Sequence, residues 1–333
     1  MTGGRMLKRC TAVEGGFSYI GAVAAYLLIL FVFSLIGHAS GGAGGKLLDY
    51  FATILLQICF LLAATIPFKA MHSRPTYVPT RITVKTGFVS VGIACMCVVF
   101  FTGLATLFNA ALAAAGYEGG SSVDMASPSG VVFAVLISVI LAPLCEEMLF
   151  RSSVLSSLGV MFGRKRDTLI TVFMTVLCGA AFALMHANPE QTVYQFFLGA
   201  VMAYAVIRTG SLTPAIIIHA VNNIIGIVLS IPAIDGGISS VAANVVSSGY
   251  GIAVFAAASV ALAVAGVFVI RLVIKKTGDR VPEPVYKSLD EESGSVSYAD
   301  DGGTVAGAVF CVVAALICAA MWTINLIGGL SAQ

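Results

Sequence analysis

Long apolar stretches separated by short polar connections dominate this chain. A helix needs about 20 mainly apolar residues to cross a bilayer. The sequence supplies such stretches at 17–37, 48–68, 87–115, 131–159, 169–185, 191–207, 214–231, 252–274 and 305–330. The pattern predicts an all-α, polytopic integral membrane protein with about eight to nine transmembrane helices.

Composition strengthens this prediction. Of the 333 residues, 59% are hydrophobic and only 10% are charged, and the mean hydropathy is +0.99. Soluble domains carry about 25% charged residues. We therefore expect the membrane domain to make up the protein, without a soluble domain held by one anchor helix.

Charge and cysteine usage argue against a nucleic-acid-binding protein and against a fold held by disulfides or a zinc ribbon. The net charge is only +2, and the basic residues are spread over short connections, so nucleic acid is not an expected partner. The eight cysteines fall almost entirely within apolar stretches, without disulfide-framework or zinc-ribbon spacing. We expect them to pack as small apolar side chains.

The basic residues predict a topology. They cluster in alternate connections, and the positive-inside rule places such connections in the cytoplasm. The clusters are Arg5, Lys8 and Arg9; Lys69, Arg74, Arg81 and Lys85; Arg164, Lys165 and Arg166; Arg208; and Arg271, Lys275, Lys276 and Arg280. The first apolar stretch is longer than the roughly 7 to 15 residues of a signal-peptide core, so we expect it to be retained. A bacterial cytoplasmic membrane with the N-terminus inside is the expected location.

Polarity divides the chain into three parts. Residues 1–276 form the predicted membrane core, with the polar motifs of interest within 131–230. Residues 277–304 hold Pro282, Pro284 and several acidic residues, which favours a flexible cytoplasmic linker. Residues 305–333 then supply an additional C-terminal transmembrane helix.

Two adjacent glutamates and an arginine lie inside the fourth apolar stretch. Each charge at a helix centre costs about 2.5 to 3.5 kcal/mol on insertion scales, so Glu146, Glu147 and Arg151 mark a candidate functional site. Glu147 and Arg151 are spaced i, i+4, which suits a structural ion pair. Helix geometry turns Glu146 about 100° away, toward a different target. A carboxylate held out of bulk water suits general acid/base chemistry.

Two of the four histidines fall in the same part of the chain. His186 ends the fifth apolar stretch, where it could position a water molecule beside Glu146. His219 and Asn223 are spaced i, i+4 in the seventh, so both can donate hydrogen bonds to one oxyanion. The expected depths of these residues in the membrane, counted from the basic connections, disagree, however. Glu146 and His186 lie about 20 to 27 Å from the basic connection at Arg164, but His219 lies only about 10 Å from Arg208.

These residues form three motifs in order: E-E-x-x-x-R at 146–151, F-x-x-x-H at 182–186 and H-x-x-x-N at 219–223. Their order and spacing resemble those of the CAAX prenyl protease and bacteriocin-processing (ABI) family, over about residues 130–230. The resemblance implies an intramembrane glutamate endopeptidase with a conical active-site cavity, acting on a membrane-associated or prenylated peptide. It implies Glu146 as base, His186 as a water-positioning residue, and His219 and Asn223 as oxyanion donors.

Other interpretations remain open. Zinc could be held by Glu146, His186 and His219, because two histidines and a glutamate are common catalytic zinc ligands, although no H-E-x-x-H is present and we expect no cofactor. A Cys145 nucleophile is disfavoured because a thiol in apolar surroundings stays inert. The second hypothesis, after the protease, is a membrane protein without protease activity, such as a bacteriocin-immunity factor or a scaffold for a partner helix.

Overall fold

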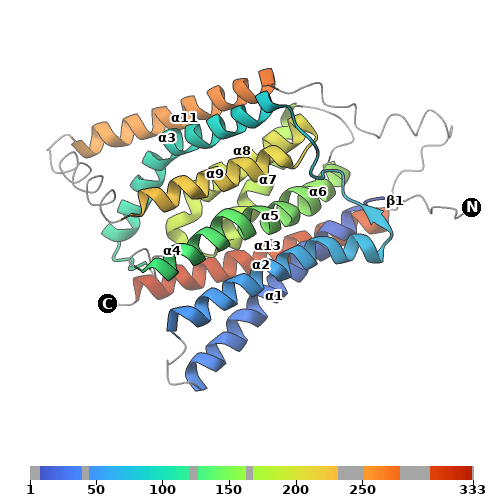
Figure 1. Cartoon of the computed structure of the whole chain (residues 1–333), viewed down its shortest axis with the longest axis horizontal. Coiled ribbons are helices and arrows are strands. Elements are labelled where there is room, and N and C mark those ends of the chain that lie inside the picture. The colour runs from blue at the N-terminus through green and yellow to red at the C-terminus, as the bar shows by residue number, and fades with distance from the viewer. Residues whose placement is uncertain are drawn as a thin grey trace, which may run out of the picture.

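The computed structural model describes residues 8–39, 45–119, 127–162, 168–231, 251–277 and 301–331. Helices make up nearly all of this part of the chain (Figure 1). They are α1 (Ala12–Ala39), α2 (Gly45–Ala70), α3 (Val84–Ala114), α4 (Pro128–Ala134), η1 (Val135–Leu141), α5 (Ala142–Glu147), η2 (Met148–Val154), α6 (Leu155–Phe162), α7 (Thr168–Met185), α8 (Pro189–Thr209), α9 (Thr213–Leu229), α11 (Gly251–Thr277) and α13 (Asp301–Leu330). Two strands of two residues each, β1 (Lys8–Arg9) and β2 (Ser73–Arg74), pair in parallel.

Each predicted transmembrane stretch coincides with a helix, and the all-α class is confirmed. The fourth stretch is a continuous helical run from Pro128 to Phe162, in which η1 and η2 are π-helical. In the described part of the chain, seven helices are long and apolar enough to cross a membrane. The apolar helix α9 is shorter, and α8 carries Glu190 and Arg208 near its ends.

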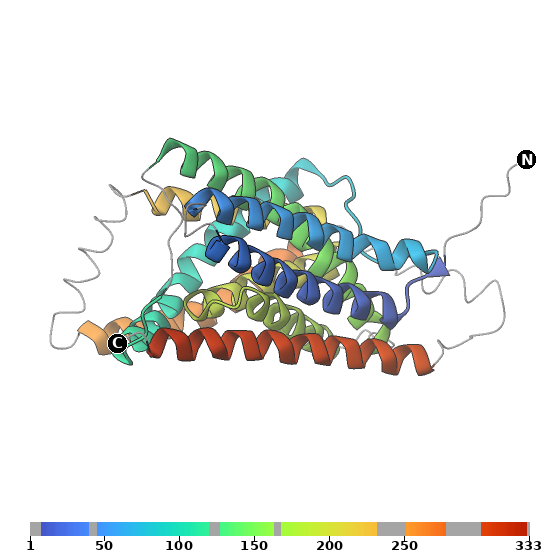
Figure 2. The same ribbon diagram turned by 90° about the horizontal axis from the view of Figure 1, so that it is seen from below.

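In the view of Figure 1 the 128–162 run crosses the middle of the bundle, between α2 and α9. Its α5 and η2 segments pack against α2, and α5 and η1 pack against α9. α1 packs between α2 and α13, α7 packs against α8, and α3 packs against α11. Figure 2 shows β1 at one end of the bundle and the C-terminal end of α13 at the other.

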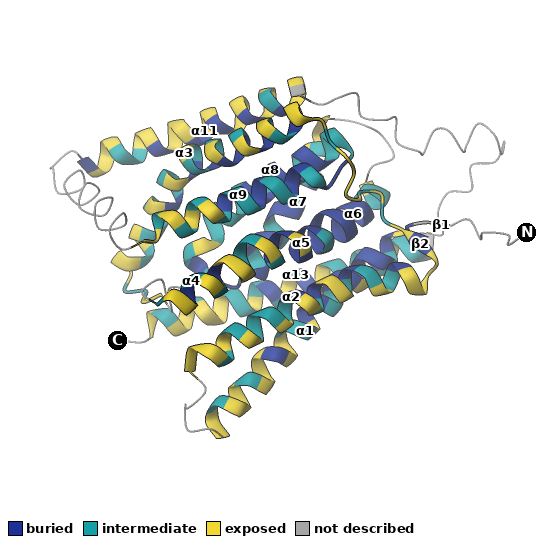
Figure 3. Cartoon of the chain, in the orientation of Figure 1, coloured by how far each residue is buried: buried dark blue, intermediate teal, exposed yellow. Residues whose placement is uncertain are grey.

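Burial follows this arrangement. The second half of the 128–162 run, from α5 to α6, and the facing sides of its neighbours are largely buried, whereas α4 and η1 are mostly half-buried or exposed and the outward faces of α1, α2, α11 and α13 are largely exposed (Figure 3). These outer faces carry large apolar side chains, such as Leu28 at 62% and Leu316 at 64% exposure. An apolar exterior around a bundle with satisfied backbone hydrogen bonds is what a bilayer requires.

The basic connections in the described part of the chain gather at one end. β1 pairs with β2, Val78 bridges to Ser211, and Thr213 Oγ1 donates to the carbonyl of Thr80 at 2.7 Å. These contacts bring the N-terminal strand, the connection after α2 and the α8–α9 turn together. Arg208, Arg271 and Lys275 line one cavity at this end. The predicted cytoplasmic position of this end stays a prediction, and the basic cluster at 164–166 lies outside the described residues.

The last helix packs closely on the first. A Cβ atom on Gly307 of α13 would lie 2.3 Å from the backbone of Ala12, and one on Gly16 would lie 2.8 Å from the Gly307 carbonyl oxygen. Small residues at a membrane helix crossing allow such backbone contact. The predicted linker falls mainly on residues 278–300, outside the described residues, so its flexibility stays a prediction.

Candidate active site

The two glutamates sit on a short α-helical segment between two π-helical turns. Pro143 is the second residue of this segment, and its missing N–H cannot complete the regular hydrogen-bond ladder. The preceding π turn is one known way for a helix to absorb such an interruption, and π turns are frequent at functional sites. Both Glu146 and Glu147 are buried.

Glu147 is the centre of a buried charge network. Its Oε1 accepts hydrogen bonds from Arg151 Nη1 at 2.8 Å and from His219 Nδ1 at 2.9 Å. Arg151 also donates from Nη2 to the carbonyl of Gly199 at 3.0 Å, and its guanidinium lies 4.3 Å from the centre of the Phe182 ring. Glu147 and Arg151 are both fully shielded from solvent, so their mutual contact replaces hydration.

Glu146 is hydrogen-bonded by a side chain of α2. Its Oε1 accepts a hydrogen bond from Gln57 Nε2 of α2 at 2.8 Å. Its Oε2 is buried without a hydrogen-bond partner among the described residues and lies 4.0 Å from His219 Nε2. This distance is too long for a direct hydrogen bond but lets one water molecule lie about 2.8 Å from each atom.

His219 lies between the two carboxylates. Helix geometry predicted different targets for Glu146 and Glu147, but one imidazole faces both, with Nδ1 toward Glu147 and Nε2 toward Glu146. Because Nδ1 donates to a carboxylate, a neutral ring would turn a lone pair on Nε2 toward a second carboxylate. Donation from Nε2 as well as from Nδ1 requires a proton on both ring nitrogens.

His186 approaches this cluster through Phe182. Its Nδ1 lies 2.8 Å from the Phe182 carbonyl oxygen, which can only accept, so Nδ1 carries the proton and Nε2 is left to accept a hydrogen bond. The Phe182 ring contacts the rings of both His186 and His219, at centroid distances of 4.8 and 5.7 Å. The F-x-x-x-H motif therefore gives one aromatic ring that touches both histidines.

Asn223 bonds across to the central run. Its Nδ2 donates to the carbonyl of Ser138 in η1 at 2.6 Å, which leaves the second N–H of the amide for another acceptor. The neighbouring Asn222 is buried and accepts a hydrogen bond from the Tyr194 hydroxyl. Among the described hydrogen bonds, the amide of Asn223 joins α9 to the run that carries the glutamates, whereas Asn222 joins α9 to α8.

The disagreement in depth is resolved by staggered helices. The connection after α2 folds against the central run well before the run ends at Phe162. Ser152 Oγ donates to the Tyr77 carbonyl at 2.7 Å, and the Thr76 N–H donates to Ser156 Oγ at 2.9 Å. The same connection contacts the start of α9. The site therefore lies only a few turns from the basic end, and α6 continues past it.

Two contacting groups were missed by sequence reasoning. Gln57 is a polar residue inside an otherwise apolar stretch, which is a usable signal, although nothing local indicates its partner. Gly199 supplies a backbone carbonyl, which no sequence pattern marks. A Cβ on Gly199 would lie 3.0 Å from the Phe182 ring and 3.3 Å from Arg151 Nη2, so glycine lets the guanidinium approach the α8 backbone.

The last helix supports the turn that carries His186. Asn325 Nδ2 of α13 donates to the Ala187 carbonyl at 2.6 Å, and Trp322 Nε1 donates to Thr192 Oγ1 at 2.7 Å. Ala187 has a positive φ of 50°, which is uncommon for a residue other than glycine. α13 thus holds a backbone conformation that positions His186.

The residues of the zinc interpretation do not gather as a set of three. Glu146 Oε2 and His219 Nε2 lie 4.0 Å apart, whereas the described contacts of His186 are with the carbonyl and the ring of Phe182. In the described part of the chain, no group of three His, Cys, Asp or Glu side chains is arranged to hold a metal ion. The site does not fit a three-ligand zinc centre.

The fold and the site define an integral, multi-pass membrane protein in which carboxylates, imidazoles and a guanidinium meet inside the helix bundle. Residues 128–225 match the model of the family described as type II CAAX prenyl endopeptidase, Rce1-like. This match contains all three motifs and confirms the family resemblance predicted from them. Comparisons with curated proteins and with solved structures gave no match.

Proposed function

We propose that this protein is an intramembrane endopeptidase of the CAAX type, in which Glu146 activates a water molecule. The family match supports a peptidase at the level of the family. The observation that carries the mechanism is the buried Oε2 of Glu146, which has no partner among the described residues and lies 4.0 Å from His219 Nε2. That pair of atoms can hold a water molecule in a site shielded from bulk solvent.

Each group has a step in the proposed reaction. The water oxygen attacks the peptide carbonyl carbon, and the water proton passes to Glu146. His219, oriented by Glu147, donates from Nε2 to the developing oxyanion, and the second amide N–H of Asn223 adds a donor. The C–N bond then breaks, and the proton held by Glu146 passes to the departing amine. His186 Nε2 accepts a hydrogen bond from the attacking water and fixes its orientation.

The proposed substrate is a membrane-associated or prenylated peptide. Its support is the family match and the position of the site inside an apolar bundle, a few turns from the basic end. The test is to place the full chain in vesicles with peptides extracted from membranes and to identify new peptide ends by mass spectrometry. Vesicles with Glu146→Gln are the matched control. New ends that form equally with both proteins would exclude the proposal.

We expect cleavage to be independent of bound metal. The site does not gather three ligands, and Arg151 places a positive charge against Glu147, which opposes a nearby cation. Incubation with 1,10-phenanthroline, followed by its removal, should leave the cleavage rate within about twofold. Metal analysis of the purified protein should give well under one zinc per chain. Loss of activity that added zinc restores would show that the water is metal-activated.

Asn325→Ala is expected to slow cleavage through the position of His186. A side-chain hydrogen bond between membrane helices is worth about 0.6 to 1.7 kcal/mol, so losing the bond to Ala187 should lower kcat by about 3- to 17-fold. KM should change little because Asn325 is not proposed to touch substrate. Thr323→Ala, on an exposed face of the same helix, is the control. An equal loss in both variants would argue for a general weakening of α13.

A further inference from the structure

A groove on the far side of α8 from the glutamates is lined by cations at one end and by apolar side chains along its length. One cavity of about 420 Å³ lies between α7, α8 and α11, with Arg208, Arg271 and Lys275 in its wall. A second, of about 680 Å³, lies between α3, α7 and α8. Both cavities include Phe196 and Phe197, so they adjoin along α8.

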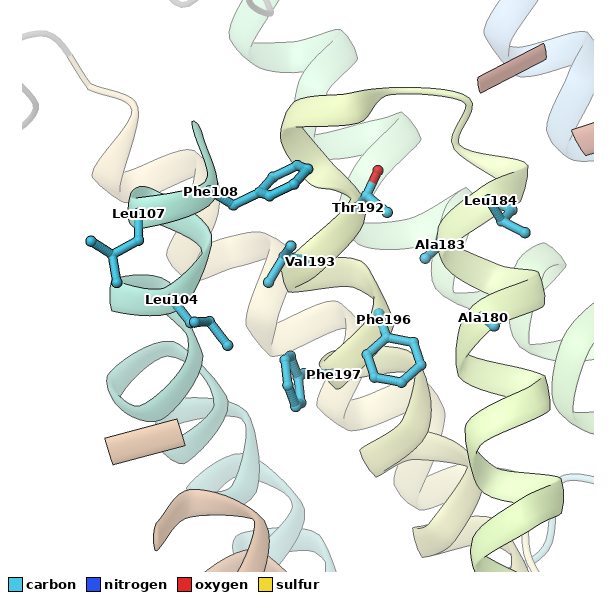
Figure 4. A pocket seen from close by; sticks show the side chains of 10 residues that line it. All are labelled: Leu104, Leu107, Phe108, Ala180, Ala183, Leu184, Thr192, Val193, Phe196 and Phe197. Atoms are coloured by element: carbon cyan, nitrogen blue, oxygen red, sulfur yellow. The ribbon is translucent and has the colours of Figure 1, made fainter. Parts of the chain in front are cut away.

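The side chains of the second cavity show how apolar this groove is. In Figure 4, α3 contributes Leu104, Leu107 and Phe108, and α8 contributes Val193 and the two phenylalanines. Thr192 is the one polar residue of its lining. None of the candidate active-site residues lines either cavity, so the groove is separate from the proposed catalytic site.

Among the described residues that line the cavity, the cationic end has no acidic side chain. Arg208, Arg271 and Lys275 come from two helices. The Nε atom of Arg208 is buried without a hydrogen-bond partner among the described residues. Arg271 and Lys275 are spaced i, i+4 and therefore share one face of α11. Three cations that line one cavity favour an anion there, and Arg271 and Lys275 are exposed and so accessible to it.

The dimensions match one membrane leaflet. Half of a hydrocarbon core of about 30 Å is about 15 Å, which equals about ten helical residues. Counted back along α8 from Arg208, this length ends close to Phe197, where the two cavities adjoin. A lipid whose phosphate lies beside the cations would thus have its acyl chains along the first cavity.

We propose that this groove binds an anionic phospholipid, with its headgroup phosphate at Arg208, Arg271 and Lys275 and an acyl chain against α7, α8 and α11. Basic pockets between transmembrane helices are suited to anionic headgroups. The acyl chain of a phospholipid adds apolar contact that a free anion lacks. The proposal does not depend on proteolysis, since the groove and the glutamates occupy different sides of α8.

The test measures lipid binding to the full chain in detergent by native mass spectrometry. Each cation near a headgroup contributes about a fivefold effect, so phosphatidylglycerol with long chains should bind on the order of 100-fold more tightly than phosphatidylcholine. The combined variant Arg208→Gln, Arg271→Gln and Lys275→Gln should lose this preference. The control Lys69→Gln, Arg81→Gln and Lys85→Gln removes three exposed cations elsewhere on the same end and should keep it.

A second pair of variants tests the acyl chain. Val267 is exposed and lines the groove, so Val267→Trp should block it, whereas Val264→Trp on the same helix lies outside the lining and should not. Melting temperatures in detergent would confirm that each variant folds. Equal binding of both lipids, an unchanged preference in the triple variant, or equal binding of short-chain phosphatidylglycerol or inorganic phosphate would each overturn the proposal.

Discussion

Glu146→Gln is expected to lower peptide cleavage by about 10²- to 10⁴-fold, which is the usual contribution of a general base. The amide keeps the shape of the side chain and can still accept the hydrogen bond from Gln57 through its oxygen. It cannot take a proton from water at the position of Oε2. The loss should therefore appear in kcat, with a smaller change in KM, in vesicles that contain an identified substrate.

Folding must be measured beside activity for this variant. Glu146 has no cationic partner as close as the Arg151 of Glu147, so neutralising it should change the detergent melting temperature by only a few degrees. Full cleavage by a folded Glu146→Gln protein would contradict the proposed mechanism. If Glu146→Ala also rescued a deletion strain completely, the protein would act by binding, as an immunity factor or scaffold does.

The transmembrane helices could be predicted from sequence because the bilayer imposes length and hydropathy on each of them. The predicted fourth stretch, 131–159, falls inside the observed run from Pro128 to Phe162. Its π-helical turns could not be predicted. A π-helix (i→i+5 hydrogen bonds) and an α-helix (i→i+4 hydrogen bonds) can be built from the same apolar residues, so the sequence does not distinguish them. Pro143 was the one local sign of an interruption.

The site was predicted in part for a similar reason. The Glu147–Arg151 pair follows from i, i+4 spacing and is present at 2.8 Å. The contact between Glu147 and His219 spans 72 residues and depends on how α9 packs, which no local pattern states. The same holds for Gln57, which reaches Glu146 across 89 residues. The roles proposed for His186, His219 and Asn223 stay predictions until variants are measured.

Arg151→Leu is expected to destabilise the fold more than any other single change at the site. Among the described residues, it leaves the fully buried Glu147 carboxylate with His219 as its one side-chain hydrogen-bond donor, and it removes the bond to the Gly199 carbonyl. Breaking a buried ion pair by removing one partner costs about 3 to 5 kcal/mol. The free energy of unfolding, measured by SDS titration in mixed micelles, should fall by that amount, and cleavage should fall with it.

A double-variant cycle separates the ion pair from the packing of its members. Glu147→Gln combined with Arg151→Leu leaves no uncompensated charge at this position, so it should be more stable than Arg151→Leu alone. Cleavage should remain low in the double variant, because a glutamine at 147 orients His219 less strongly than a carboxylate does. Arg81→Leu, at an exposed position, controls for the loss of an arginine. Additive effects of the two single changes would mean that the pair does not act as a unit, and that each side chain contributes only its own packing.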